Sequence, residues 1–307
     1  MEYPNIESYL AEHGERLGVY QGPDFQALNL PTRQSILGPW LCEQSLTMVY
    51  AERGLGKSFL MLGLAIAVAR GEDFLNYKAI QPQRVLYVDG EMPPVLLQER
   101  LKLLTGGYVP SYLMPLSACV AGENWVDFAD PHGRLQLLEI IKNTRPKVVI
   151  LDNKSTLIGS TKENEADSWR DIQSWFITLR KMGLAVVLVH HSGKNGLQRG
   201  TSLTEVVLDT IIKLSNPRDR ESHENGARFI LSYEKNRHFF GPEAAPQLVS
   251  LTTTSQGPIW EAQPWQGPSM ADVEEAHRLK AEGLSQREIA QRMGIALGKV
   301  NKLLKGE

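Results

Sequence analysis

Short apolar runs alternate with segments of helical periodicity between about residue 46 and residue 250 of the chain. Apolar, β-rich runs separated by amphipathic segments are typical of a mostly parallel sheet whose faces are covered by helices. The predicted strands are residues 46–50, 84–89, 147–152, 184–190, 210–214 and 228–234. The pattern therefore predicts an α/β domain with a mostly parallel sheet.

The pattern changes on both sides of this predicted domain. Residues 6–17 have the spacing of a short amphipathic helix, whereas residues 22–40 contain Pro and Gly and predict an irregular lead-in. Pro and Gly are also frequent between residues 258 and 268, which is typical of a linker. We predict four parts: a lead-in over residues 1–40, the α/β domain over 41–255, a linker over 256–269 and a small all-α module over 270–307.

The composition is that of a soluble globular protein, with 42% hydrophobic residues among 307. The apolar stretch after residue 58 is too short to span a bilayer, and the N-terminus has neither the basic start nor the apolar core of a signal peptide. Cys42 and Cys119 are too few for a zinc site or a disulfide framework and predict buried free thiols. We therefore expect a cytoplasmic protein without membrane contact, whose net charge of −2 leaves any DNA contact to local basic patches.

The first predicted strand runs into Ala-Glu-Arg-Gly-Leu-Gly-Lys-Ser at residues 51–58, and an apolar helix follows. This order of elements binds the phosphates of a nucleoside triphosphate, because glycines let backbone N–H groups approach and the helix dipole favours an anion. Lys57 would contact the β- and γ-phosphates, and the Ser58 hydroxyl would ligate Mg²⁺. The alternative is a structural glycine turn. We expect ATP to contact Arg53, Gly54, Leu55, Gly56, Lys57, Ser58 and Phe59.

Acidic residues follow two further predicted strands, at the sheet edge where open α/β sheets bind ligands. Glu91 is a candidate to orient or deprotonate the attacking water of ATP hydrolysis, while Asp89 is a candidate cap of the turn or of the next helix. The alternative for Glu91 is a solvated loop acid. Asp152 ends an apolar run, a pattern in which a carboxylate holds the hydration shell of Mg²⁺ or bonds to Ser58.

Two later strand ends carry polar pairs. His190 and His191 precede a glycine-containing basic loop, and either could hydrogen-bond the γ-phosphate and transmit its loss to that loop. Lys235 and Arg237 alternate with Asn236, so on an extended segment both side chains project from one face. Because adjacent cations repel each other, we predict that they meet the ATP of a neighbouring subunit and stabilise charge on its γ-phosphate. The alternative is a solvated surface pair.

The chain resembles the RecA-like hexameric ATPases between about residues 34 and 249, on the ordered motifs A-E-R-G-L-G-K-S, Y-V-D-G-E-M-P-P, V-V-I-L-D, L-V-H-H-S-G-K, R-G-T-S and E-K-N-R. The branch that contains the replicative helicase RepA of IncQ plasmids is the most similar, and DnaB is more distant. The resemblance implies a RecA-like P-loop NTPase core that binds ATP and Mg²⁺ and assembles as a homohexameric ring. The chain departs from the family where Ala51 replaces the first glycine of the loop, and in its C-terminal extension.

The resemblance also implies roles for the matched residues. In this family the lysine and serine of the loop bind Mg-ATP, the glutamate is the catalytic base and the aspartate is the metal-site acid. The strand-end histidine couples the γ-phosphate to DNA, and the K-x-R cations act on the ATP of a neighbouring subunit. The residues that match these roles are Lys57, Ser58, Glu91, Asp152, His190, Lys235 and Arg237. Loops that line the ring pore contact single-stranded DNA, and Lys194 and Arg199 lie where one such loop is expected.

The spacing of residues 283–304 predicts a helix-turn-helix. Ser285 can cap the first helix, with Glu288 completing a capping box, and Gly294 can make the turn. The second helix carries lysines with no acid among them, and the module resembles the helix-turn-helix domains of recombinases and sigma-like factors. The predicted DNA contacts of this module are Gln286, Lys299, Asn301, Lys302 and Lys305. The alternative is a small helical bundle for protein contacts.

Three functions fit these patterns. The first is a ring-forming, DNA-dependent ATPase that serves as a replicative DNA helicase of a plasmid, phage or integrated element. The second is a DNA-binding regulatory ATPase whose nucleotide state controls assembly without unwinding. The third is a RecA-type accessory ATPase of recombination or repair. A catalytic glutamate together with paired cations favours the first, because a nucleotide-gated switch does not need both.

Overall fold

The computed structural model describes residues 19–30, 32–122, 127–157, 166–192, 207–217, 226–254, 257–267 and 270–305. The chain divides into two compact units, Met1–Arg33 and Gln34–Glu307. In the first unit α2 (Gly22–Ala27) has a proline in its first turn, so part of the predicted irregular lead-in is helical. The helix predicted over residues 6–17 lies outside the described residues.

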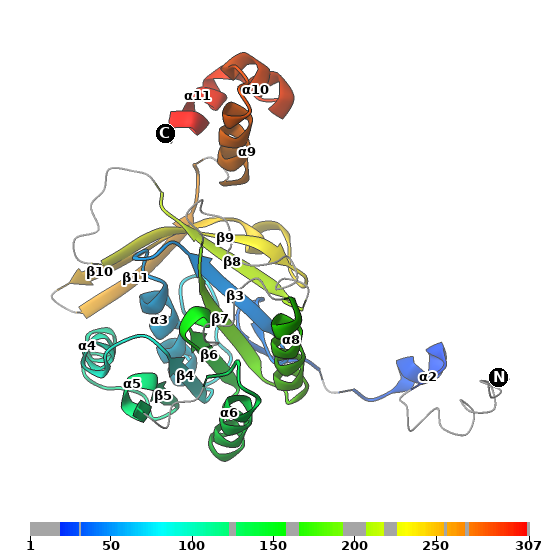
Figure 1. Ribbon diagram of the computed structural model, residues 1–307, viewed down its shortest axis with the longest axis vertical. Coiled ribbons are helices and arrows are strands. Elements are labelled where there is room, and N and C mark those ends of the chain that lie inside the picture. The colour runs from blue at the N-terminus through cyan, green and yellow to red at the C-terminus, as the bar shows by residue number, and fades with distance from the viewer. Residues whose placement is uncertain are drawn as a thin grey trace. The chain divides into compact units, whose positions relative to one another are not determined.

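A nine-stranded sheet forms the centre of the second unit (Figure 1). Its order is β11-β10-β9-β8-β3-β7-β6-β4-β5, in which β8 to β5 are parallel and β9, β10 and β11 are antiparallel to their neighbours. The strands are β3 (Leu46–Ala51), β4 (Val85–Asp89), β5 (Leu113–Ser117), β6 (Val148–Asp152), β7 (Ala185–His191), β8 (Thr210–Ser215), β9 (Gly226–Asn236), β10 (Gln247–Thr254) and β11 (Gly257–Pro264). The predicted α/β class, the mostly parallel sheet and the six predicted strands are confirmed. The sequence analysis did not predict β5, β10 or β11.

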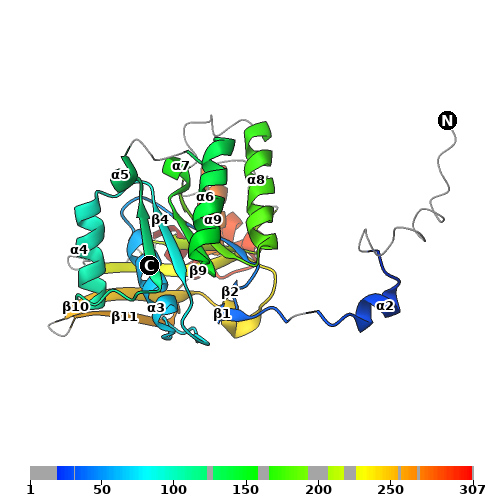
Figure 2. The ribbon, with the colours of Figure 1, turned by 90° about the horizontal axis from the view of Figure 1, so that it is seen from below.

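Helices cover both faces of the sheet, so alternate residues of each central strand enter different hydrophobic clusters. Val49 of β3 faces the cluster of α3 (Lys57–Arg70) and α4 (Pro94–Thr105), while Met48 faces that of α6 (Pro131–Thr144) and α8 (Ala166–Lys181). Figure 2 shows α6 and α8 together on one face of the sheet. Burial on both faces explains why these strands are continuous apolar runs in the sequence.

The predicted linker is wrong over most of its length, because residues 257–264 form β11, which pairs with β10 along its whole length. Trp260 and Ala262 pack against the core, while Ile259 and Glu261 are exposed. Prolines near the ends of the strand are tolerated because β11 lies at the edge of the sheet. They also hide the alternating pattern that would have indicated a strand.

Three helices form the C-terminal part of the described chain: α9 (Met270–Ala281), α10 (Gln286–Met293) and α11 (Leu297–Lys305). They bury a small core of their own, which includes Leu279, Ile289 and Leu303. The predicted capping box is confirmed, since the Ser285 hydroxyl accepts from the Glu288 N–H while the Glu288 carboxylate accepts from the Ser285 N–H. Local sequence signals therefore suffice to place α10.

The remaining elements are short: β1 (Ser35–Leu37), β2 (Leu41–Cys42), α5 (Ala118–Ala121), α7 (Lys154–Leu157) and η3 (Gly241–Ala244). Both cysteines are free thiols, but Cys119 is exposed and Cys42 half-buried, so the prediction that they are buried is wrong. Within the described ranges, each helix is too short or too polar to cross a membrane.

Candidate active site

The glycine-rich loop joins the end of β3 to the start of α3. Gly54 and Gly56 have φ angles of 81° and 95°, in the region that favours glycine. Gly56 also has no room for a side chain, because a Cβ there would lie 2.6 Å from the Cβ of Ala227 on β9. As the N-cap of α3, Gly56 leaves the N–H groups of the first helical turn available to an anion.

A cavity of about 450 Å³ opens at this loop. Its walls come from the phosphate loop, the start of α3, the ends of β4, β6 and β7, the start of α4 and the start of β9. The lining residues are Arg53, Gly54, Gly56, Lys57, Ser58, Phe59, Asp89, Glu91, Met92, Pro93, Leu96, Arg100, Asp152, His191 and Gly226. Most of the predicted catalytic and nucleotide-binding residues therefore meet in one place, at the carboxyl ends of the parallel strands.

Lys57 is buried and folds back over the loop that precedes it. Its ammonium donates to the carbonyl oxygens of Ala51 at 2.8 Å and Glu52 at 2.6 Å. Burial lowers the pKa of Lys57 to about 8, although the charges of Asp152 and Glu91 oppose this shift. The cation is thus held at the phosphate loop, where an anionic ligand would favour its charged form.

Asp152 ends β6 and is 5% exposed. The Tyr87 hydroxyl donates to its Oδ2 at 2.6 Å, and Ser58 makes a second hydrogen bond to the carboxylate. Burial raises the pKa of Asp152, and these two hydrogen bonds partly offset the rise. The predicted pairing of Asp152 with Ser58 is therefore present.

These two oxygens suit a hydrated Mg²⁺, whose charge would compensate for the burial of the Asp152 carboxylate. Within the part of the chain that the structure describes, three or more His, Cys, Asp or Glu side chains never gather as a metal site. Mg²⁺ commonly uses one or two protein oxygens, with phosphates and water as its other ligands. Ser58 and Asp152 fit that mode of binding.

Asp89 ends β4 and shapes the turn that follows. Its Oδ1 accepts from the N–H of Met92 at 2.6 Å and from the N–H of Glu91 at 3.2 Å. Burial raises the pKa of Asp89 to about 6. The prediction that Asp89 caps this turn is confirmed, and the turn carries Glu91 to the cavity.

Glu91 meets two polar partners from neighbouring strand ends. The Asn153 Nδ2 donates to the Glu91 Oε2 and lies 3.1 Å from the His191 Nε2. The Glu91 Oε2 and the His191 Nε2 are 3.6 Å apart. Burial, together with the charge of Lys57, lowers the pKa of His191. Sequence reasoning misses Asn153, although an amide directly after the strand-end acid was an available signal.

The two histidines at the end of β7 face opposite sides of the sheet. His191 lines the cavity, whereas His190 is fully buried beside Tyr50 of β3. The choice of His190 as the residue at the γ-phosphate is therefore corrected. Side chains alternate along a strand, and this alternation turns His190 with Leu188 toward the α6 and α8 face.

The cavity has an apolar wall beyond the phosphate loop. The Arg100 guanidinium lies 4.6 Å from the centre of the Phe59 ring, and Leu96 of α4 also lines this wall. Leu55 instead packs against the core, so a nucleotide contact there would come from its backbone. Sequence reasoning identifies Phe59 but misses Arg100, which reaches the cavity from a helix of a different segment.

Lys235 and Arg237 lie far from this cavity. Gly226 lines the cavity, and β9 continues from it for ten more residues, roughly 30 Å of extended chain. At that end an Arg237 guanidinium nitrogen is 4.0 Å from Oδ1 of Asp209, a buried carboxylate that also accepts from Arg180 at 2.8 Å. The chain therefore does not bring its paired cations to its own phosphate loop.

The predicted DNA contacts divide into two groups. Lys194 and Arg199 lie outside the described residues, as does the side chain of Lys305. The others are on the C-terminal helices, where Gln286 and Asn301 are half-buried and Lys299 and Lys302 are exposed.

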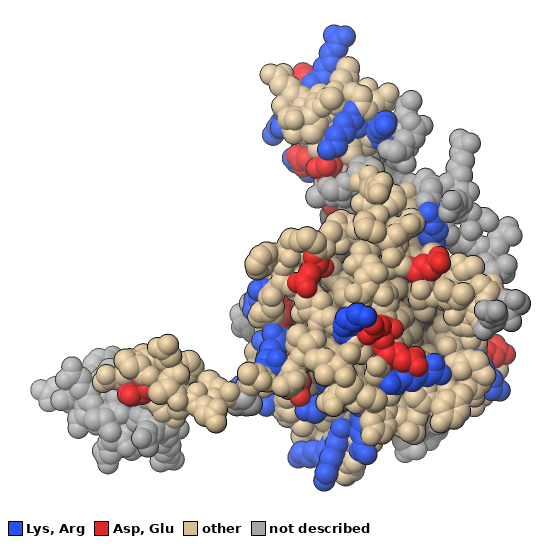
Figure 3. Space-filling view, turned by 180° about the vertical axis from the view of Figure 1, so that it is seen from behind, with Lys and Arg blue, Asp and Glu red and all other residues tan. Residues whose placement is uncertain are grey.

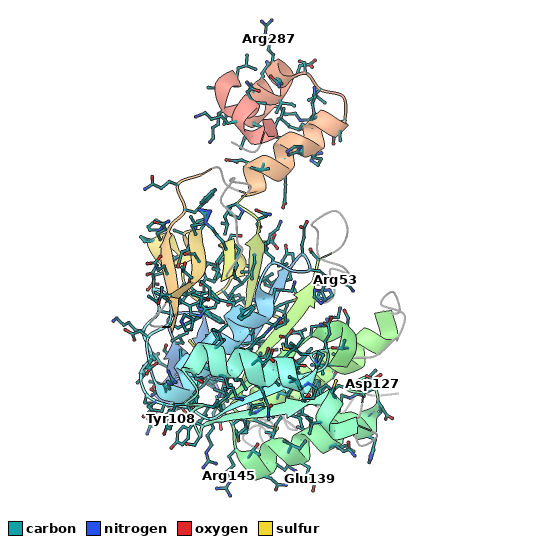
Figure 4. All side chains as sticks on the ribbon, turned by 90° about the vertical axis from the view of Figure 1, so that its left-hand side faces the viewer. Arg53, Tyr108, Asp127, Glu139, Arg145 and Arg287 are labelled. Carbon is teal, nitrogen blue, oxygen red and sulfur yellow. The ribbon has the colours of Figure 1, made fainter. Side chains whose placement is uncertain are left out.

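Acidic residues partly neutralise the positive charge of these helices. Lys299 is 3.6 Å from Asp272 of α9. Figure 4 shows Arg287 pointing outward from α10, as a further exposed cation of this module. On the face seen in Figure 3, acidic and basic side chains are interspersed, in keeping with the small net charge. Any attraction for DNA would therefore be local.

Comparison with known proteins gives a consistent picture. Residues 20–197 match the family model described as an AAA domain. The DNA repair protein RadA of Listeria monocytogenes serovar 1/2a is 24% identical over 220 residues, which cover 68% of this chain and 40% of that protein. RadA of Aquifex aeolicus is 24% identical over 187 residues, or 59% of this chain and 36% of that protein. The matched region thus spans about two fifths of the length of these relatives.

The fold is also similar to a solved structure, the KaiC-like protein PH0186 of Pyrococcus horikoshii OT3. The TM-score is 0.50 at 12% identity, and the match covers 72% of this chain and 90% of the other. At this identity the likeness concerns the fold alone. It agrees with the mostly parallel sheet and with the phosphate loop after a central strand.

Proposed function

The chain belongs to the family of AAA domains, with a RecA-like P-loop ATPase core, and on that basis we propose that it hydrolyses ATP in a ring of identical subunits that acts on DNA. The observation that carries the proposal is the convergence of Lys57, Ser58, Glu91 and Asp152 in one cavity. A site that only bound nucleotide would need the loop and the metal ligands. A carboxylate on the turn opposite the loop adds a base for water.

Each residue has a role in the proposed reaction. Lys57 and the loop N–H groups bind the β- and γ-phosphates, and Ser58 and Asp152 hold Mg²⁺. Glu91 takes a proton from the attacking water. His191, rather than His190, is the proposed contact of the γ-phosphate, because it lines the cavity beside Glu91.

The paired cations support a ring. Because Lys235 and Arg237 lie at the far end of β9, they could act on ATP only if it is bound by another subunit. We propose that they stabilise charge on the γ-phosphate of the neighbour, as a homohexamer would permit. ATP would then be hydrolysed only in the assembled protein.

The C-terminal helices support contact with DNA. The Ser285 capping box, the turn at Gly294 and the basic α11 support a helix-turn-helix, and we propose that this module binds duplex DNA. A single module with Lys299 partly neutralised by Asp272 would bind weakly. Several copies in a ring would raise the apparent affinity through their effective concentration.

Two activities remain candidates for the assembled protein. The catalytic base and paired cations favour a motor, which we propose is a replicative helicase of a plasmid, phage or integrated element. The similarity to proteins named DNA repair protein RadA favours an accessory ATPase of recombination or repair. A regulatory ATPase that binds DNA without unwinding it is the third outcome of the test below.

The test measures ATP turnover of the full chain with and without single-stranded DNA, in the wild type and in Glu91→Gln. Displacement of one strand from a forked duplex is recorded in parallel. We expect DNA to raise turnover, Glu91→Gln to lower it by roughly 10²–10⁴-fold, and the wild type to separate the fork. Turnover that DNA does not change, without displacement, would favour the regulatory ATPase, while stimulation without displacement would favour the repair accessory.

The DNA module is tested separately. Lys302→Ala should weaken binding to duplex DNA and reduce the salt dependence of binding by about one phosphate contact. Lys280→Ala is the matched control, because Lys280 is exposed on α9 outside the basic helix. Equal effects of the two variants would mean that α11 is not the DNA-contacting helix.

A further inference from the structure

We propose that Asn153 is a positioning residue that restrains the catalytic base Glu91 and ties it to His191. The inference rests on the proposed ATPase function. It adds a residue that lies outside the motifs by which the site is recognised. Asn153 is 1% exposed and stands at the start of α7, directly after the metal-site acid.

Hydrogen bonding fixes the orientation of the Asn153 amide. Its Oδ1 accepts from the Ser155 N–H at 3.0 Å, so the oxygen faces α7 and the NH₂ group faces the cavity. One Nδ2 hydrogen is directed to the Glu91 Oε2 and the other to the His191 Nε2. A primary amide has two such hydrogens, so both donors are in use and each partner must act as an acceptor.

The backbone around Glu91 is held close to Asn153. The Gly90 N–H donates to the Asp152 carbonyl oxygen at 2.8 Å. A Cβ on Gly90 would lie 2.5 Å from the Thr156 hydroxyl and 2.7 Å from a methyl carbon of Leu157, both on α7. Gly90 therefore permits a close approach that a larger residue would prevent. The contact between Glu91 and Asn153 follows from this packing rather than from a chance side-chain orientation.

The restraint acts on the proton-transfer step. In hydrolysis a water oxygen bonds to the γ-phosphorus while the bond from phosphorus to the ADP oxygen breaks, and the water proton moves to the Glu91 carboxylate. An N–H donor on Oε2 occupies a lone pair of the carboxylate that would otherwise be available to the water proton. It also holds Glu91, whose side chain is 60% exposed, against the strand ends. Release of this hydrogen bond would free the base.

His191 is the route by which the restraint could be released. Its ring shares the Asn153 amide with Glu91 and lies at the last residue of β7. If a γ-phosphate binds the His191 ring, the His191 Nε2 is no longer available as the second acceptor for the Asn153 amide. Binding of DNA near the end of β7 could act on the same side chain. We therefore infer that Asn153 lowers turnover in the absence of DNA.

The experiment compares Asn153→Ser with Asn153→Ala in the full chain. A serine hydroxyl can still accept from the Ser155 N–H but is too short to reach Glu91, whereas alanine loses both contacts. Loss of the hydrogen bond from Asn153 to the Glu91 carboxylate predicts that Asn153→Ser raises DNA-independent turnover about fivefold. Turnover at saturating DNA should stay near the wild-type value, so the stimulation ratio falls by the same factor. Binding of a fluorescent ATP analogue should be unchanged.

The Glu91→Gln background provides the decisive control. Because Asn153 acts through Glu91, Asn153→Ser should leave the residual single-turnover rate of Glu91→Gln unchanged. A rise of equal size in that background would overturn the inference, as would an equal loss of turnover with and without DNA. If the wild type has no ATPase activity, the proposed function fails instead. If it has activity that DNA does not affect, the rise in basal turnover still tests the restraint.

Discussion

The two ends of the parallel strands balance their charges differently. At the carboxyl ends, the cavity is lined by the carboxylates of Asp89, Glu91 and Asp152 and by the cations of Arg53, Lys57 and Arg100. At the amino ends of β3 and β8, the single carboxylate of Asp209 lies beside Arg180, Arg237 and His238. In Figure 4, Arg53 of the phosphate loop marks the carboxyl ends of the parallel strands, and Arg145, which follows α6 and precedes β6, marks their amino ends.

Each cluster has a different unmet requirement. At the carboxyl end, Asp89 and Asp152 are buried carboxylates, so this end gains from Mg²⁺ and from further cations at a triphosphate. In the cluster at the amino ends of β3 and β8 the one acid, Asp209, already accepts through its Oδ2 from Arg180 and from the Leu46 N–H at 2.9 Å. The cations of this cluster would suit a triphosphate bound at the carboxyl end, but the two ends lie on opposite edges of one chain. A second subunit is the simplest way in which they could meet.

The largest expected effect is at the carboxyl end. Asp152→Asn should lower ATP turnover by about 10²–10⁴-fold, because the metal would lose its only anionic protein ligand and several kcal/mol of charge stabilisation. ATP hydrolysis by the purified variant, titrated with Mg²⁺, measures this loss. Asp130→Asn is the matched control, since Asp130 caps α6 at an exposed position. If both variants kept full turnover, the cavity at the carboxyl end would not be the active site.

The next effect tests whether the two ends meet. Arg237→Ala should lower turnover by roughly 10²–10³-fold, as expected for a group that stabilises transition-state charge. Mixing it with Glu91→Gln should restore activity, because a wild-type cavity on one subunit would then face a wild-type Arg237 on another. Lys78→Ala, at an exposed position elsewhere, should leave turnover unchanged. Full activity of Arg237→Ala in the assembled protein would rule out its role as a finger.

A smaller effect concerns the structural role of Asp209. Asp209→Asn should lower the free energy of unfolding by about 2–3 kcal/mol, since Arg180 would lose its charged partner in a largely buried site. The asparagine can still accept from the Leu46 N–H. Urea unfolding followed by circular dichroism measures the change. A variant as stable as the wild type would show that Asp209 serves mainly to orient Arg237.

A further effect on stability, of similar size, is the pH dependence that Asp89 contributes. Its pKa is about 6 in the folded protein and near 3.8 when unfolded, so between these values the folded state binds more protons. The contribution of Asp89 to stability is therefore complete below pH 4 and is lost as pH rises through 6. Asp89→Asn should remove this loss, so the variant gains on the wild type between pH 4 and 6. Urea unfolding of the wild type and of Asp89→Asn at both pH values measures this gain. A difference in the free energy of unfolding between the two proteins that is the same at both pH values would contradict the raised pKa of Asp89.

Local sequence patterns were enough to predict much of the chemistry. The phosphate loop, the acids after β4 and β6, and the capping box of α10 depend on residues that are close together in the chain, so their local patterns carry the information. The continuous apolar runs indicated β3, β4, β6, β7 and β8 because burial on both faces demands them, whereas β9 is partly exposed along its length. The prolines of β11 concealed its alternation, and a linker was predicted where an edge strand packs Trp260 on the core.

Contacts between residues of different strands could not be predicted in the same way, because they depend on how the strands are arranged in the sheet. The choice between His190 and His191 depended on the register of β7, in which one step along the strand exchanges the cavity for the opposite face. Asn153 and Arg100 were likewise invisible as site residues, because their partners Glu91 and Phe59 come from other segments. Local patterns record what each segment must form, whereas the contacts that tune the base arise only when distant strand ends are brought to one edge.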